Sequence, residues 1–211
     1  MNFRGNLIVL SGPSGVGKDA ILEGILKIVP RLVKSVSFTT RPKRPGEKEG
    51  KSYFFTDEET FKEMIKQGKF LEWACVHGYL YGTPKKFVEE RLAAGYDVIL
   101  KIDVQGGVNV KKICEDAKLI FILPPSFNEL KRRLMDRNTE SEKDLATRLK
   151  DVPLEISRIS YYDYAVINEN LNEAVDLVRC IILAERHRLY KEKVEYYIKN
   201  LGGEVDERND Y

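Results

Sequence analysis

The chain has 211 residues, of which 43% are hydrophobic and 32% charged, so it is long enough for one domain with a buried core. Its 35 lysines and arginines nearly balance 33 acidic residues, and the net charge of +2 argues against partners that need a broad basic surface, nucleic acid and membranes. Three widely spaced cysteines, Cys75, Cys114 and Cys180, fit neither a disulfide framework nor a zinc cluster. Since no apolar run has the length of a signal peptide, we expect a cytoplasmic protein, either a monomer or a small homo-oligomer.

Apolar runs of strand length alternate with helical patterns along the chain. Residues 7–10 form the first run, and after a glycine-rich stretch the apolar residues from Ala20 to Ile28 recur with helical spacing. Two later runs have the same strand character and each follows a helical segment: residues 98–102 after 84–94, and residues 119–123 after 105–114. This alternation predicts an α/β fold, a parallel sheet with helices on both faces.

Capping residues predict where further helices begin. Thr56 and Ser126 are each followed three residues later by a glutamate, which is the spacing of a capping box. Thr83 precedes Pro84, and proline suits the first position of a helix. We therefore expect helices to start just after these three positions.

The remaining segments complete a single predicted domain. Residues 165–167 have the pattern of a last short strand, and residues 171–198 that of one long closing helix. Residues 35–83 and the charged stretch 137–153 break the alternation, and we expect them over the edge where the strands end. The parts are a core (1–34, 84–125, 154–203), an insert (35–83), a lid (126–153) and a solvated tail (204–211).

The stretch Gly-Pro-Ser-Gly-Val-Gly-Lys, residues 12–18, matches the glycine and lysine positions of a phosphate-binding loop (P-loop) between a strand and a helix. Glycines let the backbone curl around phosphate oxygens, and the helix N-terminus adds positive charge. The ammonium group of Lys18 adds a full charge for the β- and γ-phosphates. We expect ATP to bind Gly12, Pro13, Ser14, Gly15, Val16, Gly17, Lys18 and Asp19.

Asp19 departs from the P-loop pattern, which has a serine or threonine hydroxyl on Mg²⁺ at this position. A carboxylate can also bind Mg²⁺, directly or through water. The sequence therefore predicts Asp19 as the protein ligand of the Mg²⁺ that accompanies ATP.

A turn-rich segment of prolines and a glycine, residues 37–47, brings Arg41 and Arg44 close together. Both guanidinium groups could face one anion. Because arginine pairs in loops are more often solvated, this segment alone does not decide between an anion site and an ordinary surface.

Seven motifs in one order, spread over nearly the whole chain, resemble the guanylate kinase family. They are Ser-Gly-Pro-Ser-Gly-Val-Gly-Lys (11–18), Thr-Thr-Arg-Pro-Lys-Arg-Pro-Gly-Glu (39–47), Tyr-Phe-Phe (53–55), Phe-Leu-Glu-Trp (70–73), Tyr-Leu-Tyr-Gly-Thr (79–83), Ile-Asp-Val-Gln-Gly (102–106) and Arg-Asn-Thr-Glu (137–140). The resemblance implies a P-loop nucleoside monophosphate kinase: a five-stranded parallel core flanked by helices, a small mixed-sheet GMP-binding insert and a helical lid. It also implies direct transfer of the γ-phosphoryl group of ATP, with Mg²⁺, to GMP and to dGMP.

By this resemblance, the GMP phosphate is held by Ser37, Arg41, Arg44, Tyr53 and Tyr81, and guanine by Glu72, Thr83 and Asp103. The chemistry agrees, because guanine has N1–H and N2–H₂ donors that one carboxylate can accept side by side, and an O6 that a hydroxyl can satisfy. Adenine lacks the N1–H and the amine at position 2. Without the resemblance, Glu72 has the pattern of a polar strand residue and the tyrosines that of aromatic packing.

The lid supplies the other implied contacts. Arg137 and Arg148, with Arg133 nearby, resemble lid arginines that close over the ATP phosphates, and Asn168 resembles a contact to the adenosine. Phosphoryl transfer spreads negative charge over several oxygens, which arginine forks suit. The catalytic residues implied in this way are Lys18, Arg41, Arg137 and Arg148.

Lys101 is a second departure, because familiar members of the family often have an acidic residue there. Alternation along the strand places Ile99, Lys101 and Asp103 on one face, near the predicted site. A lysine cannot ligate a metal, but it could neutralise phosphate or pair with Asp103.

Two other functions fit parts of the pattern. Guanylate kinase-like domains of membrane-associated scaffolds bind phosphorylated peptides and typically have a damaged P-loop, whereas the glycines and Lys18 are intact here. A P-loop kinase for another acceptor, such as a different nucleoside monophosphate or a phosphorylated sugar, would not need Glu72 with Thr83.

Overall fold

The computed structural model describes residues 3–136 and 142–202. Its centre is a five-stranded sheet in the order β2-β7-β1-β8-β9, in which every neighbouring pair is parallel. The strands are β1 (Leu7–Ser11), β2 (Leu32–Lys34), β7 (Asp97–Lys101), β8 (Lys118–Leu123) and β9 (Tyr164–Ile167). The parallel α/β core expected from the alternating pattern is confirmed.

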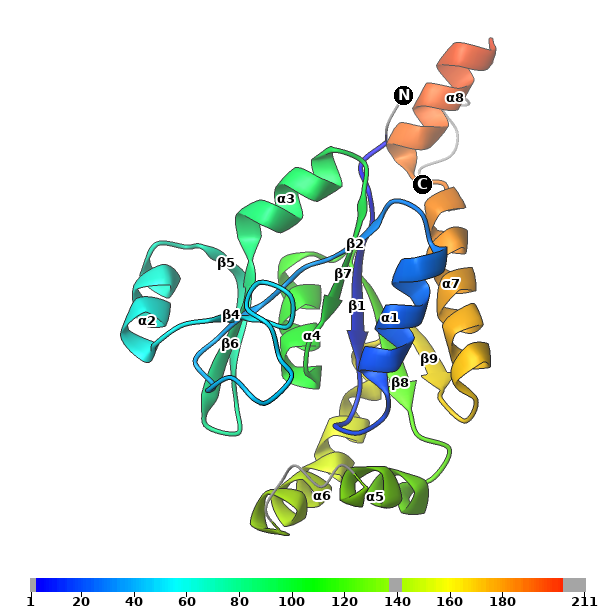
Figure 1. Ribbon diagram of the computed structural model, residues 1–211. Coiled ribbons are helices and arrows are strands. Elements are labelled where there is room, and N and C mark those ends of the chain that lie inside the picture. The colour runs from blue at the N-terminus through cyan, green and yellow to red at the C-terminus, as the bar shows by residue number, and fades with distance from the viewer. Residues whose placement is uncertain (1–2, 137–141, 203–211) are drawn as a thin grey trace.

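Helices cover both faces of this sheet because alternate residues of each strand point to opposite sides. On β1, Ile8 and Leu10 face α1 (Lys18–Ile28) and α7 (Leu171–His187), and these three elements contribute to one buried cluster. Leu7 and Val9 face the opposite side, where α3 (Lys85–Ala93) and α4 (Val104–Ile113) pack. Figure 1 shows α1 and α7 together on one side of the sheet.

A second, four-stranded sheet in the order β4-β3-β6-β5 lies beside the core (Figure 1). It contains β3 (Phe38–Thr39), β4 (Phe54–Phe55), β5 (Phe70–Val76) and β6 (Tyr79–Pro84), and α2 (Glu58–Lys66) precedes β5. The β3–β4 pair is parallel and the other pairs are antiparallel, so the sheet is mixed, as expected. His77 and Gly78 both have positive φ and form the two-residue turn of the β5–β6 hairpin.

Two helices, α5 (Phe127–Met135) and α6 (Glu142–Ser157), lie beyond the carboxyl ends of the strands, at the bottom of Figure 1. Leu130 and Leu134 of α5 and Val152 of α6 are buried with the core, so this region is anchored to the sheet. A short 3-10 helix (Arg158–Tyr161) leads from α6 to β9. In the described part of the chain, no helix combines the length and the apolar character needed to cross a membrane.

Two of the three expected helices begin one residue later than their expected caps predict, so those caps were wrong. The N-cap of α2 is Asp57, whose carboxylate accepts from the Thr60 N–H, while the N–H of Thr56 pairs with Thr39 and so extends the strand pairing. The cap of α3 is Pro84, because β6 continues to that residue. Ser126 caps α5 as expected, through the N–H of Glu129.

The single long closing helix was also wrong. The chain leaves the helical conformation at Arg188, and α8 (Lys191–Leu201) then runs on beyond the end of α7 (Figure 1). The Lys193 ammonium donates to the carbonyls of Arg186 and Arg188, 2.6 and 3.3 Å away. The ring of Phe3 packs edge-on against three tyrosines of this region: Tyr190, Tyr196 and Tyr197. Both helices are amphipathic, so apolar spacing alone did not reveal the break between them.

Candidate active site

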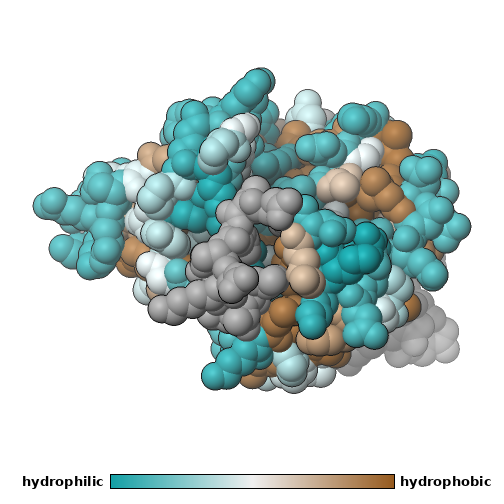
Figure 2. Space-filling view, turned by 60° about the horizontal axis from the view of Figure 1, so that its bottom comes forward, coloured by the Kyte–Doolittle hydropathy of each residue, from teal (hydrophilic) through white to brown (hydrophobic). Residues whose placement is uncertain are grey.

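The cleft that brings the expected site residues together has a volume of about 580 Å³ and lies at the carboxyl ends of β1 and β7. Its walls come from the loop after β1, the small sheet and α6, and from residues as distant in the chain as Gly12 and Glu155. Figure 2 views the molecule from the end that carries α5 and α6, where the visible surface is largely hydrophilic with scattered apolar residues.

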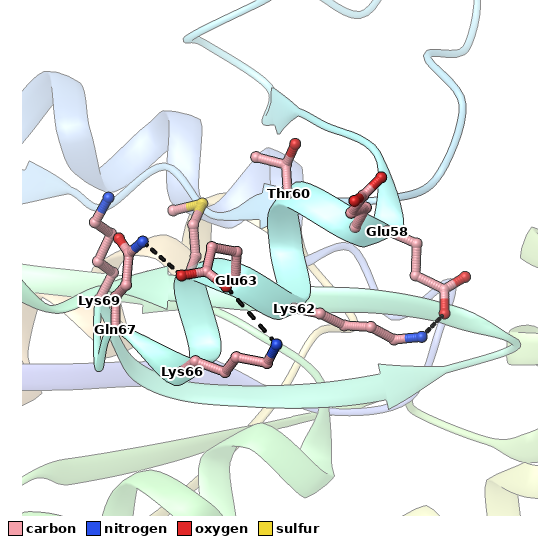
Figure 3. A pocket seen from close by; sticks show the side chains of 9 residues that line it. Glu58, Thr60, Lys62, Glu63, Lys66, Gln67 and Lys69 are labelled. Carbon is pink, nitrogen blue, oxygen red and sulfur yellow. Dashed lines mark hydrogen bonds and ion pairs between the residues drawn. The ribbon is translucent and has the colours of Figure 1, made fainter.

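A larger hollow, about 700 Å³, lies along α2 (Figure 3), but its chemistry is that of a solvated helix. All of its lining residues fall within residues 58–69. Their charges pair along the helix, Lys62 with Glu58 at 2.6 Å and Lys66 with Glu63 at 3.8 Å. Such exposed pairs are typical of a surface helix, so we assign the chemistry to the cleft at the sheet edge.

The loop between β1 and α1 has the geometry of a phosphate cradle. Gly12 and Gly17 have φ angles of 139° and 95°. A Cβ on Gly12 would lie 2.2 Å from the Ile122 carbonyl oxygen, so the close approach to β8 needs glycine. The ammonium group of Lys18 donates to the carbonyls of Gly12 and Pro13, 2.6 and 2.8 Å away, and therefore lies folded against the loop.

The charges of Lys18 and Glu155, which both line the cleft, act on each other. Burial lowers the pKa of Lys18 to about 8, although the charge of Glu155 opposes that shift. Burial likewise raises the pKa of Glu155 to about 7, although Lys18 favours its ionised form. A ligand that brings opposite charge or polar atoms into the cleft would stabilise the charged form of each group.

Two polar side chains brace the loop from outside. The Asn168 amide donates to the Val16 carbonyl, 2.8 Å away, and Asn168 is buried. Arg133 donates in turn to the Asn168 carbonyl at 3.0 Å. From the lid, the Arg148 guanidinium donates to the Ser14 hydroxyl at 2.7 Å. Arg137, the other expected lid arginine, lies outside the described residues.

On the opposite wall, one carboxylate organises both arginines of the second expected anion site. Glu47 accepts from the Arg41 guanidinium at 2.5 Å and from the Arg44 backbone N–H at 2.8 Å. The Arg41 guanidinium carbon lies 5.5 Å from the centre of the Tyr53 ring. Tyr53 and Tyr81 are edge-to-face neighbours, and Ser37 lines the same wall.

At the inner end of this wall, Glu72 on β5 lies opposite Thr83 on β6. The Thr83 hydroxyl donates to a Glu72 oxygen at 2.6 Å, and both residues are buried. Burial, together with the nearby charge of Asp103, raises the pKa of Glu72 to about 7 against the effect of the Thr83 hydrogen bond. A hydroxyl that Glu72 already engages is not free to serve a ligand without turning.

Asp103 is the N-cap of α4, and its carboxylate accepts from the N–H groups of Gln105 and Gly106. A Cβ on Gly106 would lie 3.1 Å from an oxygen of Asp103 and equally close to an oxygen of Glu72. The two carboxylates therefore converge over a glycine, in a space that a side chain would fill.

Lys101 reaches a partner that the sequence did not suggest. Its ammonium group donates to the carboxylate of Asp19, the residue after Lys18, and not to Asp103. The physical reason is that the Asp103 oxygens are turned toward the α4 N–H groups, whereas Asp19 opens the first turn of α1 beside the end of β7.

Comparison with known proteins agrees with this geometry. The guanylate kinase family model matches residues 4–185. The chain belongs to the guanylate kinase family. Among curated guanylate kinases, that of Thermotoga maritima is 45% identical over 203 residues, covering 95% of this chain and 98% of the relative. That of Caldanaerobacter subterraneus is 46% identical over 196 residues, covering 93% and 95%.

A solved guanylate kinase structure, that of Anaplasma phagocytophilum, superposes with a TM-score of 0.81 at 35% identity, covering 97% of this chain and 99% of that one. The five-stranded parallel sheet and the small mixed sheet thus belong to a guanylate kinase fold. The family model matches up to residue 185, within α7, whereas the superposition with the Anaplasma structure covers 97% of this chain.

Several residues that line this guanylate kinase cleft were not singled out from the sequence. Glu47 ends the motif of residues 39–47, and its position close to Arg41 and Arg44 could have indicated that it pairs with them. Glu155 follows Arg148 by two helical turns, a spacing that places both on one face of α6. His77, whose ring lies 3.7 Å from Asp151 of α6, offered no signal, because that contact depends on how the small sheet and the lid lie in space.

Proposed function

We propose that this guanylate kinase transfers the γ-phosphoryl group of ATP to GMP and releases ADP and GDP. The observation that carries the proposal is the layout of the cleft, with a P-loop on one wall and an arginine pair with buried carboxylates on the other. Such a layout suits two nucleotides that meet phosphate to phosphate. An oxygen of the GMP phosphate then forms a bond to the γ-phosphorus as the bond to the β–γ bridging oxygen breaks.

On the donor wall, the glycine backbone and the N-terminus of α1 would hold the ATP phosphates, with Lys18 moving from the loop carbonyls to the β- and γ-phosphates. Arg148 would leave Ser14 for the same oxygens, and we assign Arg137 the same task. Asn168 remains a proposed neighbour of the adenosine, although its amide already braces Val16.

On the acceptor wall, Ser37, Arg41, Arg44, Tyr53 and Tyr81 would hold the GMP phosphate. Glu72 would accept the N1–H and N2–H₂ donors of guanine, with Asp103 beside it, and the Thr83 hydroxyl would turn to O6. These contacts address the base and the phosphate, which dGMP shares, so we propose dGMP as a second acceptor.

The Mg²⁺ that accompanies ATP has a fitting side chain in Asp19, since carboxylate oxygens are the ligands this ion prefers. The described residues, Asp19 included, form no cluster of three or more potential metal ligands, so the ATP phosphates and water would complete the coordination. When bound, the ion would neutralise charge on the β- and γ-phosphates. Binding it requires the Asp19 carboxylate to turn away from Lys101.

Two alternatives are separated by one measurement. ADP production is followed with GMP, AMP, CMP and UMP in turn, and GMP is expected to be preferred by orders of magnitude, because a site built for guanine donors rejects bases that lack them. Binding of a phosphorylated peptide without turnover of any nucleotide would instead support the peptide-binding module. Equal turnover of another monophosphate would support a different acceptor. Localisation in the cytoplasm and a monomeric or small oligomeric state remain part of this proposal.

A further inference from the structure

The end of β7 carries a lysine in the middle of the cleft. The side chain of Lys101 is 15% exposed, and its ammonium group pairs with Asp19 on the donor wall. The same ammonium lies 5.7 Å from the centre of the Tyr53 ring on the acceptor wall. Arg41 contacts that ring as well, at 5.5 Å. Lys101 therefore lies between the P-loop and the arginine pair, Arg41 and Arg44.

Like charges are held together around this position. Burial and the charge of Lys101 both lower the pKa of Lys18, and both also lower the pKa of Lys34. Burial alone would lower the pKa of Lys101 as well, but Tyr53, Asp19 and Glu47 together raise it, so its ammonium group keeps its proton. The three cations Lys18, Lys34 and Lys101 repel one another at one end of the empty cleft, and an entering polyanion would relieve that repulsion.

The ion pair itself adds little to the stability of the fold. Asp19 has a side chain that is 64% exposed, and pairs that reach into solvent are weak because water screens them. Stability therefore gives little reason for a lysine at this position, whereas its place in the lining of the cleft puts it within reach of a bound ligand.

We propose that Lys101 is a further catalytic residue, which exchanges Asp19 for the oxygens of the phosphoryl group in transfer. The inference rests on the proposed function. The ammonium keeps all its protons and only donates hydrogen bonds, while the new P–O bond to GMP forms and the bond to ADP breaks. As charge spreads over the phosphoryl oxygens, a cation already fixed between both nucleotides stabilises that distribution without reorganisation.

The test compares Lys101→Met and Lys101→Arg with the wild type and with a matched control, Lys111→Met. Lys111 is also a partly buried lysine that pairs with an aspartate, Asp163 at 3.0 Å, but it lies outside the cleft. Initial rates give kcat and both KM values. Calorimetry gives the affinities for ADP alone, GMP alone, and ADP with GMP and aluminium fluoride, a stand-in for the phosphoryl group in flight. Thermal unfolding gives the midpoint of each variant.

For Lys101→Met, kcat is expected to fall by about 10²- to 10³-fold, the usual effect of removing one donor to a transition-state oxygen. Affinity for the aluminium fluoride complex should fall in parallel, while both KM values and the affinities for single nucleotides change by no more than about threefold. Lys101→Arg should restore much of kcat, because the charge returns. Lys111→Met should leave kcat unchanged.

Three outcomes overturn the inference. A rise in the KM for GMP with unchanged kcat would make Lys101 an ordinary ligand of the GMP phosphate. An unchanged kcat and KM would remove it from the reaction. A loss of kcat accompanied by an equal loss of affinity for single nucleotides, or by unfolding, would make its role structural. If the wild type makes no ADP with GMP, the proposed function is overturned as well. If the wild type is active and one of the three outcomes above is found, the proposed function stands and only the inference about Lys101 is overturned.

Discussion

The buried carboxylate of Glu72 is the group on which the choice of base depends. Glu72→Gln keeps the size of the side chain but puts an amide donor where a guanine donor needs an acceptor. A lost charge-assisted hydrogen bond is worth roughly 1.5 to 3 kcal/mol, and an unpaired buried donor adds to it. We expect kcat/KM for GMP to fall on the order of a hundredfold or more, with the KM for ATP nearly unchanged.

Initial-rate kinetics check this expectation, and Glu63→Gln is the matched control, since Glu63 lies on the surface of α2 in the same insert. The control should behave as the wild type does. If Glu72→Gln leaves the GMP kinetics unchanged, guanine is not recognised by this residue.

The same carboxylate gives a pH dependence with a definite sign. Burial raises the pKa of Glu72 to about 7, and only the ionised form accepts both guanine donors. The kcat/KM for GMP should therefore rise with pH and level off above about pH 7. The phosphate of GMP titrates near pH 6 as well. A pH profile of Glu72→Gln separates these two titrations, because the rise in kcat/KM that comes from ionisation of Glu72 should be absent from the profile of this variant.

Stability should change in the opposite sense. The folded protein holds the Glu72 proton to a higher pH than the unfolded chain does, so this group's contribution to stability falls as pH rises from the ordinary glutamate pKa to about 7. Glu72→Gln should hence melt at a higher temperature than the wild type at pH 8. The difference should disappear near pH 5, and thermal melts at both values check it.

Lys18 is expected to act on the transferred group and not on the acceptor. Lys18→Met should lower turnover by several orders of magnitude while calorimetry still detects GMP binding on the other wall of the cleft. The altered side chain also removes the two hydrogen bonds to the loop carbonyls, so the melting temperature should be recorded beside the kinetics. Undiminished turnover would remove the P-loop from the mechanism.

Much of the cleft could be predicted at this scale, because motif positions specify residue types. The pairs that these residues form could not. Thr83 is engaged by Glu72 across the β5–β6 hairpin, whereas Asp19 is engaged by Lys101 and Val16 by Asn168, partners that are far apart in the sequence. Such contacts depend on how strands and helices stack, which spacing along a sequence does not encode.

Among the elements, α8 is held by a few contacts that can be removed one at a time. Phe3 meets Tyr190, Tyr196 and Tyr197 edge-on, and Lys193 donates to the end of α7. Phe3→Ala should speed amide hydrogen exchange of residues 191–201 and leave guanylate kinase kinetics unchanged, because the cleft is remote in the fold. Ile113→Ala, at an exposed residue ending α4, is the control that should leave α8 unaffected.

The strands and helices of the core followed from periodicity, since a sheet covered on both faces has apolar runs in every strand. β2 was missed because it has only three residues. The caps expected at Thr56 and Thr83 were each one residue early for a related reason, because strand pairing extended past the residue that had the sequence of a cap. Local preference was overridden by contacts with a neighbouring strand.

For the whole molecule, the small sheet and the lid face each other across the cleft. His77 at the hairpin turn lies 3.7 Å from Asp151 of α6, so the two parts already touch at one point. We expect the insert (35–83) and the lid (126–153) to draw together further only when both nucleotides are bound, which excludes water as an acceptor.

Labels test this closure. Cys75 is an exposed thiol on β5, and a second cysteine at the exposed Lys150 of α6 gives a distance across the cleft once Cys114 and Cys180 are replaced. The distance should shorten with GMP and a non-hydrolysable ATP analogue together, and less with either one. An unchanged distance in all states would contradict closure.

The position of β1 also has a consequence for how the chain finds its fold. β1 is the earliest strand in the chain, yet it lies at the centre of the sheet, where Leu7 pairs with Val98 and Ile8 with Lys118. The apolar strand made first on the ribosome must therefore wait for two partners from the middle of the chain. Contacts that span so much sequence are slow to form, and until they form the strand edges stay open to association with other chains. We therefore expect β1 to stay exposed to such association until β7 and β8 have been made.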